Sequence, residues 1–156
     1  MFGGGTTRLL FKLHNFYRNR LGLRLGFEIP LNVFGKGLHI FHTGNIIINE
    51  TSSVGEYCNI IGSTCLGSKD GGNGPTIGNH CELGMNSVVI GNVKIGNNVY
   101  IGAGAVVTKS FEQNGVSLAG VPAKIVASRK DSKKVDWKIM KTVIMAGGRG
   151  TRISEL

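Results

Sequence analysis

The chain has 156 residues, enough for one domain with its own core, and its composition stands out for 25 glycines, where glycine ordinarily makes up roughly 7% of a protein. The formal net charge of +9 comes from the two ends, because residues 37–123 hold three basic and five acidic side chains. No RNA-binding aromatic motif or finger spacing accompanies this charge. The composition therefore argues against nucleic-acid binding and favours phosphorylated small molecules or an anionic membrane surface as partners.

The cysteines and the apolar runs bear on localisation. Cys58, Cys65 and Cys81 are odd in number and have no C-x-x-C spacing, which is typical of reduced thiols and not of a disulfide frame or a zinc site. No apolar run approaches the ~18–20 residues of a membrane span, and the N-terminus has no signal-peptide core or cleavage site. We predict a cytoplasmic protein, in which the glycosylation sequon at residues 49–51 is a chance match.

Residues 6–25 predict a basic amphipathic helix. Apolar residues recur there at a spacing of three to four, while Arg8, Lys12 and Arg18 lie elsewhere on the helix. We assign residues 1–27 to a basic N-terminal helical arm that packs as a cap on the fold that follows. A weak contact with an anionic membrane surface is the alternative.

The next segment repeats with a period of six residues. Neither a helical period nor plain alternation produces this pattern, whereas a triangular coil does, since three hexads close one turn and the turns stack as parallel strands. The fifth position of the hexads is small or β-branched and includes Cys58 and Cys81, and we interpret all three cysteines as packing groups. The lead positions are aliphatic throughout: Ile48, Val54, Ile60, Leu66, Ile77, Leu83, Val89, Ile95, Ile101 and Val107.

One insertion interrupts the repeat. Eleven residues separate the lead positions Leu66 and Ile77, five more than a hexad allows. The extra residues, within "GSKDGGNGPT", must leave the coil as a loop, and exposed loops on a rigid scaffold commonly carry binding. A neutral surface insertion is the alternative.

Together the hexads, the stretch "FHTGNIII", the loop after "LGS" and the ending "AGVPAKIV" resemble the hexapeptide-repeat acyltransferases over residues 28–126. The similarity is greatest to the serine O-acetyltransferase branch and its sugar O-acetyltransferase relatives. The resemblance implies a mainly β fold, a left-handed parallel β-helix, assembled as a homotrimer. It also implies acetyl-CoA as the donor substrate, bound in a groove between neighbouring coils, and no metal.

The resemblance singles out His42 as the general base. A hydroxyl acceptor must lose its proton as it attacks a thioester, and a neutral imidazole suits that task. Glu28 is the nearest equivalent of the acid that orients this imidazole in the family, although Asp is usual there and the spacing is one residue short. Counting six back from Ile48 places His42 in an inward slot, so either Gly44 breaks the register and turns the imidazole into the groove, or His42 is a core histidine.

For the donor, "IGAGAVV" and "AGVPAKIV" resemble the coenzyme A groove of the family. Small residues there let a pantetheine arm approach the backbone, and two lysines are placed to meet the phosphates. The predicted donor-binding residues are Gly84, Gly102, Ala103, Lys109, Ala119, Gly120 and Lys124. Ordinary corner residues and solvated lysines are the alternative for each.

The acceptor is predicted from a difference between this chain and the serine O-acetyltransferases. The serine enzymes carry a second histidine just before the loop proline, whereas Gly74 precedes Pro75 here. The long helical domain of the serine enzymes is also not seen before Glu28. We therefore favour a sugar hydroxyl of surface polysaccharide biosynthesis, with L-serine as the alternative acceptor. A non-catalytic β-helix scaffold fused to a nucleotidyltransferase is an alternative of another class, and a γ-type carbonic anhydrase would need three converging histidines.

His14, His39 and His80 have non-catalytic interpretations, with His80 the best placed of them to line the groove. Residues 127–139 are predicted to be a charged linker. Residues 140–156 resemble the opening of sugar-phosphate nucleotidyltransferases through "AGGRGTR", whose glycine-rich loop wraps phosphates. Seventeen residues cannot build the sheet that such a loop needs, so we predict a truncated, non-functional and poorly ordered segment.

Overall fold

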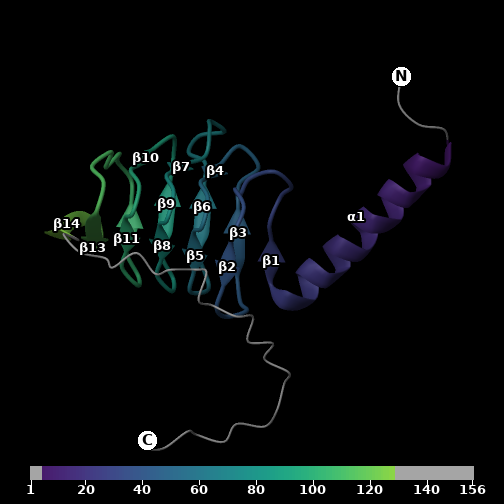
Figure 1. The fold of residues 1–156 in the computed structure, drawn as a ribbon, viewed down its shortest axis with the longest axis horizontal. Coiled ribbons are helices and arrows are strands. Elements are labelled where there is room, and N and C mark those ends of the chain that lie inside the picture. The colour runs from purple at the N-terminus through teal and green to yellow at the C-terminus, as the bar shows by residue number, and fades with distance from the viewer. Residues whose placement is uncertain (1–4, 129–156) are drawn as a thin grey trace, which may run out of the picture.

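The computed structural model describes residues 5–128. A helix, α1 (Gly5–Leu25), is followed by a parallel β-helix of about five turns, built from short strands in three sheets (Figure 1). Sheet 1 contains β1 (Phe27–Glu28), β3 (Ile46–Ile48), β6 (Cys65–Gly67), β9 (Val88–Ile90) and β12 (Val106–Val107). Sheet 2 contains β4 (Ser53–Val54), β7 (Thr76–Ile77) and β10 (Lys94–Ile95). Sheet 3 contains β2 (His39–Ile40), β5 (Asn59–Ile60), β8 (Glu82–Leu83), β11 (Tyr100–Ile101), β13 (Val116–Ala119) and β14 (Lys124–Ser128).

Each turn of the coil passes through sheets 3, 1 and 2 in that order, and strands one turn apart pair in parallel register. The pairing of β5 with β8 and of β8 with β11 stacks Ile60, Leu83 and Ile101 in one column. All three side chains are fully buried. The hexad prediction is confirmed, because the lead aliphatic of each hexad fills the interior and supplies the hydrophobic stabilisation of the coil.

The small positions of the hexads line the same interior. Cys58 and Cys81 are fully buried there, which confirms their interpretation as packing groups. Cys65 lies outside this set, one residue before the inward Leu66, and is half-buried on β6. The predicted insertion is also confirmed, since residues 69–73 between β6 and β7 are exposed and belong to no strand.

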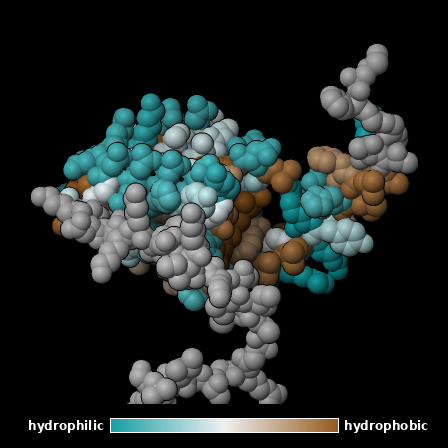
Figure 2. Space-filling view, in the orientation of Figure 1, coloured by the Kyte–Doolittle hydropathy of each residue, from teal (hydrophilic) through white to brown (hydrophobic). Residues whose placement is uncertain are grey.

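The helical arm does not cap the coil, and that expectation is wrong. α1 projects away from the β-helix, and only its C-terminal end reaches β1 (Figure 1). Its apolar side chains are left exposed, among them Leu9, Leu10, Phe16 and Leu23. Brown apolar surface accordingly gathers on the helix and on the end of the coil beside it (Figure 2).

The C-terminal end of the coil is formed by β14, which pairs antiparallel with β13. It extends to Ser128, two residues beyond the predicted boundary at 126. The rest of the predicted linker and the segment 140–156 lie outside the described residues. Within residues 5–128, no helix combines the length and the apolar character that crossing a bilayer requires.

Candidate functional site

His42 lies at the corner where the chain passes from sheet 3 to sheet 1, and its side chain is exposed. The core-histidine alternative is therefore wrong. Ile40 takes the inward slot, packed against the core, and eight positions separate it from the next lead residue, Ile48, where the later turns have six. The two extra residues lengthen the corner around Gly44, which has a φ of 142°. The carbonyl oxygen of Gly44 accepts a hydrogen bond from Ile46 N at 2.8 Å. The register break at Gly44 is thus observed.

The corner is fastened to the end of the helix. Leu25 O accepts a hydrogen bond from Gly44 N at 3.3 Å, and Gly26 O accepts one from Ile46 N at 2.9 Å. A Cβ built on Gly26 would lie 3.0 Å from the backbone of Gly44, so only glycine allows this close approach. The longer corner that carries His42 is therefore held by residues just before the first strand.

In the following turns the same corner is occupied by Gly62, Met85, Ala103 and Gly120, one residue per turn in the strand register. We call this set, with His42, the His42 column. A Cβ built on Gly62 would lie 3.3 Å from His42 Cβ and 3.6 Å from Met85 Cε. Gly62 therefore leaves a gap between the histidine and the methionine.

Most of the predicted donor-binding residues lie along this corner. Ala103 and Gly120 belong to the His42 column itself, and the neighbouring column, one residue earlier in each turn, contains Gly84, Gly102 and Ala119. Lys124 pairs with Ala119 across β13 and β14 and is exposed. Lys109 lies apart from these residues, at the next corner, with its Nζ 5.4 Å from the centroid of the Phe111 ring. The donor-binding roles stay predictions.

Coil stacking by itself explains glycine at two of these positions. A Cβ on Gly84 would lie 2.6 Å from Ala103 N and Ile101 O in the next turn, and one on Gly102 would lie 3.1 Å from Leu118 O. Ala103 and Gly120, in contrast, are exposed. The exposed backbone at this corner, accessible to a ligand, is therefore that of the His42 column.

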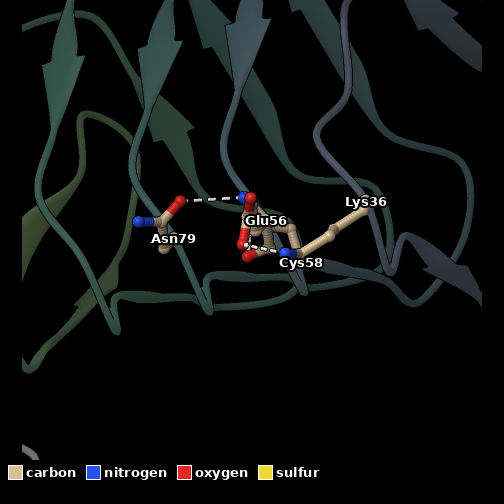
Figure 3. Close-up of polar contacts among 4 residues, drawn as sticks. All are labelled: Lys36, Glu56, Cys58 and Asn79. Atoms are coloured by element: carbon tan, nitrogen blue, oxygen red, sulfur yellow. Dashed lines mark hydrogen bonds and ion pairs between the residues drawn. The ribbon is translucent and has the colours of Figure 1, made fainter.

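Glu28 is exposed on β1, where it pairs with Ile47. Across residues 5–128 the structure contains a single ion pair, between Lys36 Nζ and Glu56 Oε2 at 3.5 Å (Figure 3). The carboxylate of Glu28 and the imidazole of His42 are thus not brought into contact in this chain. The orienting role of Glu28 stays a prediction.

The rings of the other two histidines of the coil pack against aromatic rings. His39 lies on β2 with its ring 4.1 Å from that of Phe41. His80 stacks on Tyr57 at a centroid distance of 5.3 Å, at the corner between sheets 2 and 3 and not at the corner of His42. The prediction that His80 lines the same groove as His42 gains no support from this placement.

A polar clamp holds the insertion loop at both ends, and the sequence interpretation missed it. Thr51 Oγ1 accepts a hydrogen bond from Gly74 N at 2.7 Å and donates one to Asn49 Oδ1 at 2.6 Å. Asn49 Nδ2 reaches Ser68 Oγ at 3.4 Å at the start of the loop. The residues dismissed as a chance sequon therefore position the loop. The Asn-x-Thr pattern before a hexad was a usable sign, because Asn side chains bond the backbone two residues on: Thr51 N donates to Asn49 Oδ1 at 2.9 Å.

The cysteines are poor nucleophile candidates for different reasons. The hydrogen bond with the Cys81 side chain lowers the pKa of Cys58, but this thiol is fully buried and out of reach of a substrate. Cys81 N donates a hydrogen bond to Cys58 Sγ at 3.4 Å, and the two thiols lie 3.2 Å from the carbonyl oxygens of Gly78 and Gly96. The hydrogen bond with the Cys58 side chain, together with burial, raises the pKa of Cys81. Burial also raises the pKa of Cys65. Thiolate formation is thus disfavoured at both sites.

The part of the chain that the structure describes contains no group of three or more His, Cys, Asp or Glu side chains arranged to hold a metal ion. The convergence of three histidines that a zinc-type hexapeptide enzyme needs is therefore not found within one chain.

The fold is thus a parallel β-helix of hexad repeats with an exposed histidine at a corner of small residues. Residues 74–109 match the bacterial transferase hexapeptide family, described as six repeats. Together with the solved relatives below, this match confirms the predicted left-handed parallel β-helix of hexapeptide repeats. The predicted resemblance of residues 140–156 to sugar-phosphate nucleotidyltransferases is not shown.

The individual relatives are serine acetyltransferases. The protein from Synechococcus elongatus is 36% identical over 108 residues, which cover 67% of this chain and 44% of that protein. The enzyme from Neisseria gonorrhoeae in complex with serine superposes with a TM-score of 0.64 and 33% identity, over 72% of this chain and 47% of that one. The enzyme from Brucella abortus in complex with coenzyme A gives a TM-score of 0.58 and 29% identity, over 62% and 39%.

The chain thus spans about half or less of the length of these relatives. The similarity of the chain is thus to the serine acetyltransferase-like branch of the acyltransferases. They favour the serine alternative over the sugar acceptor that the sequence interpretation preferred.

Proposed function

We propose that this protein is an O-acetyltransferase that transfers acetyl from acetyl-CoA to a hydroxyl group, with His42 as the general base. The observation that carries the proposal is the exposed imidazole of His42 in one column with Ala103 and Gly120. The base on one turn would meet the hydroxyl of the acceptor. The accessible backbone of small residues on later turns would lie along the extended donor. The coenzyme A complex of the Brucella relative supports the donor.

In this mechanism His42 accepts the proton of the acceptor hydroxyl as its oxygen attacks the thioester carbonyl carbon. The tetrahedral intermediate carries its negative charge on the former carbonyl oxygen, which backbone N–H groups would stabilise. The intermediate then collapses by cleavage of the carbon–sulfur bond, and the imidazolium returns the proton to the departing coenzyme A thiolate. The ester product and free coenzyme A account for all atoms, and no covalent enzyme intermediate is required.

L-serine is the acceptor that we propose first, because the solved and curated relatives described above are serine acetyltransferases and one of them binds serine. In this chain the acceptor would lie beside His42, with the clamped loop of residues 68–75 on the following corner. We keep Glu28 as the residue proposed to orient the imidazole of His42, although the two side chains are not in contact in this chain.

A sugar hydroxyl is the second candidate, and one structural observation favours it. Gly74 occupies the position before the loop proline, and its backbone N–H is bound by Thr51. A Cβ built there would collide with the hydroxyl of Ser52 and lie 3.1 Å from Ser52 N. No side chain fits at this position, so a second imidazole is not available from it. A site with one imidazole departs from the two-histidine pattern of the serine enzymes, and this departure favours a different acceptor.

We further propose a cytoplasmic homotrimer, with Lys109 and Lys124 meeting the phosphates of the coenzyme. A groove between coils of neighbouring subunits would bring the His42 column of one chain close to a second chain. Light scattering on the purified protein tests the assembly, since a trimer has three times the mass of the 16.6 kDa chain.

The activity is tested by mixing the protein with acetyl-CoA and following thiol release with L-serine or with a panel of sugars. We expect His42→Ala to lower turnover by roughly 10²–10⁴-fold, since that is what a general base contributes. His39→Ala is the matched control, because it removes a neighbouring imidazole and should leave turnover within about twofold. Retention of more than about one per cent of turnover by His42→Ala would reject the base assignment. Absence of thiol release with every acceptor would favour the non-catalytic scaffold.

A further inference from the structure

We propose that α1 is a membrane-surface arm that binds anionic lipid headgroups and holds the His42 corner close to the bilayer. The starting observation is the unusual position of the helix. A 21-residue helix projects from the coil with its large apolar side chains exposed, and among the described elements it contacts chiefly β1 (Figure 1).

The charge of the helix is of one sign. Residues 5–25 contain five basic side chains and no acidic one, so nothing within the helix neutralises them. The basic residues are Arg8, Lys12, Arg18, Arg20 and Arg24. The surface of residues 37–123, by comparison, carries more acids than bases. The positive charge is therefore local to the arm and suits an extended anionic surface.

The apolar side chains of the helix supply the second contribution to membrane binding, beside the positive charge. Leu9, Leu13 and Phe16 recur at a spacing of three to four and so share one face, with Arg8 and Lys12 on the neighbouring face. Their exposed fractions are 60%, 45% and 59%. Arg20 and Arg24 fall on this same face further along, so the apolar and basic faces are separate only over the first half of the helix. That half would lie in the interfacial plane, with its apolar face among the acyl chains and Arg8 and Lys12 at the headgroups.

Apolar surface is also present on the end of the coil beside the helix. A groove of about 760 Å³ at the junction is lined mainly by apolar residues of the helix end and first turn, including Leu21, Leu23 and Phe27, and its charged lining residues are Arg18 and Glu28. Leu23 and Leu31 are 85% and 51% exposed. Figure 2 shows brown surface on the arm and on the neighbouring end of the coil, with hydrophilic surface between the two. The membrane-facing surface is therefore larger than the helix alone.

Charge distinguishes the membrane from the other occupants. Two copies of the helix packed together would bring their basic side chains near each other without acids to pair with them. A nucleic acid would satisfy the charge and leave the leucines and phenylalanines in water. An anionic bilayer satisfies both, because its headgroups meet the arginines and its acyl chains cover the apolar face.

The arm is coupled to the candidate site through the backbone. Leu25 and Gly26, at the end of α1, accept the hydrogen bonds from Gly44 and Ile46 that hold the His42 corner. Binding of the arm therefore places this corner beside the membrane surface. That consequence rests on the proposed function, whereas the lipid binding itself does not.

The test is co-sedimentation of the full chain with vesicles of phosphatidylcholine alone or of phosphatidylcholine with 30% phosphatidylglycerol as the probe. We expect binding to the anionic vesicles that weakens as salt is raised, and much weaker binding to the neutral ones. Arg8→Gln with Lys12→Gln should lower the partition coefficient by about fivefold per charge. Leu13→Gln with Phe16→Gln should lower it by about tenfold or more. Gln is a good helix former, so circular dichroism should show an intact helix in both variants.

The matched control is Lys94→Gln with Lys109→Gln, which removes two exposed charges of the coil and should leave vesicle binding unchanged. Equal binding to neutral and anionic vesicles, or none to either, would overturn the proposal. A second contradicting outcome concerns Leu13→Gln with Phe16→Gln. If light scattering showed a lower oligomeric mass for this variant while vesicle binding was unchanged, the apolar face would join copies of this chain and not bind a membrane. Thiol release measured without vesicles reports separately on the proposed function.

Discussion

Gly62 is the residue on which the geometry of the His42 corner depends most. It has a φ of 152° and leaves a gap between His42 and Met85 in the adjacent turns. A Cβ at this position would come 3.3 Å from His42 Cβ, closer than nearly all such contacts in proteins. Glycine is therefore needed both for the backbone conformation and for the space beside the histidine.

We expect Gly62→Ala to lower acetyl transfer by about tenfold or more, because the added methyl crowds His42 and shifts the imidazole from its productive position. Gly91→Ala is the control. Gly91 also has a positive φ, of 93°, but a Cβ there meets only Lys69 Cβ at an ordinary 3.6 Å. Both variants should lose stability from backbone strain, and the measurement is kcat alongside urea unfolding. If the two variants lose the same share of kcat, the loss reports strain and not crowding of His42.

At this scale the sequence misplaced the direction of one side chain, while the role it gave to His42 stays a prediction. Hexad counting and the family resemblance both reach His42, but counting back from Ile48 assigned it an inward slot that Ile40 fills. The error arose because the corner at Gly44 is longer than the others, and its length depends on hydrogen bonds to the end of the helix. The clamp of Thr51 on Gly74 was missed for the same reason, since its partners are 23 residues apart.

The repeating element at the corner between sheets 2 and 3 is a ladder of asparagines. Asn79 Oδ1 accepts from Glu56 N at 2.8 Å (Figure 3), Asn97 Oδ1 accepts from Asn79 N at 2.8 Å, and Asn114 Oδ1 accepts from Asn97 N at 2.6 Å. Each side chain thus satisfies a backbone N–H in the preceding turn that the strand ladders do not reach. The ladder joins neighbouring turns outside the hydrophobic interior.

Asn97→Ala removes two side-chain hydrogen bonds, the one from Asn79 N and the longer one from Asn97 Nδ2 to Asn114 Oδ1 at 3.3 Å. We expect it to lower the free energy of unfolding by about 1–3 kcal/mol, at about 0.5–1.5 kcal/mol for each hydrogen bond. Asn92→Ala is the matched control, because Asn92 is an exposed corner asparagine without a hydrogen bond to the other described residues, and its loss should stay within about 0.5 kcal/mol. Urea unfolding followed by circular dichroism measures both. An unchanged midpoint for Asn97→Ala would show that water replaces the side chain without cost.

Local periodicity explains why the coil was predictable and the arm was not. Each hexad repeats the same local choice, an aliphatic residue inward and a small residue at the corner, so Ile77, Leu83 and Val89 could be placed by counting. The direction of α1 has no such repeat to fix it. An apolar stripe predicts that this face of the helix packs against something. The sequence does not say whether its partner is the first turn of the coil or another molecular surface.

At the scale of the whole molecule, the turns form one continuous interior in which each turn contacts only its neighbours. Cys58 and Cys81 lie in that interior on successive turns, with no exposed surface. Access of a reagent to these thiols therefore reports opening of the coil. Cys65 is half-buried on the outer side of β6 and reports only on its own surroundings.

We expect a thiol-specific reagent at pH 8 to modify one cysteine slowly in the native protein and all three after unfolding in urea. The slow native reaction belongs to Cys65, because burial raises its pKa and lowers the thiolate fraction at a given pH. Its rate should keep rising at a pH where an ordinary exposed thiol, with a pKa of about 8.5, has levelled off. Cys65→Ser should abolish the native reaction without changing the number of thiols released by urea beyond the one removed. Rapid native modification of Cys58 or Cys81 would contradict a closed interior, since both must leave the stacked turns before a reagent can reach them.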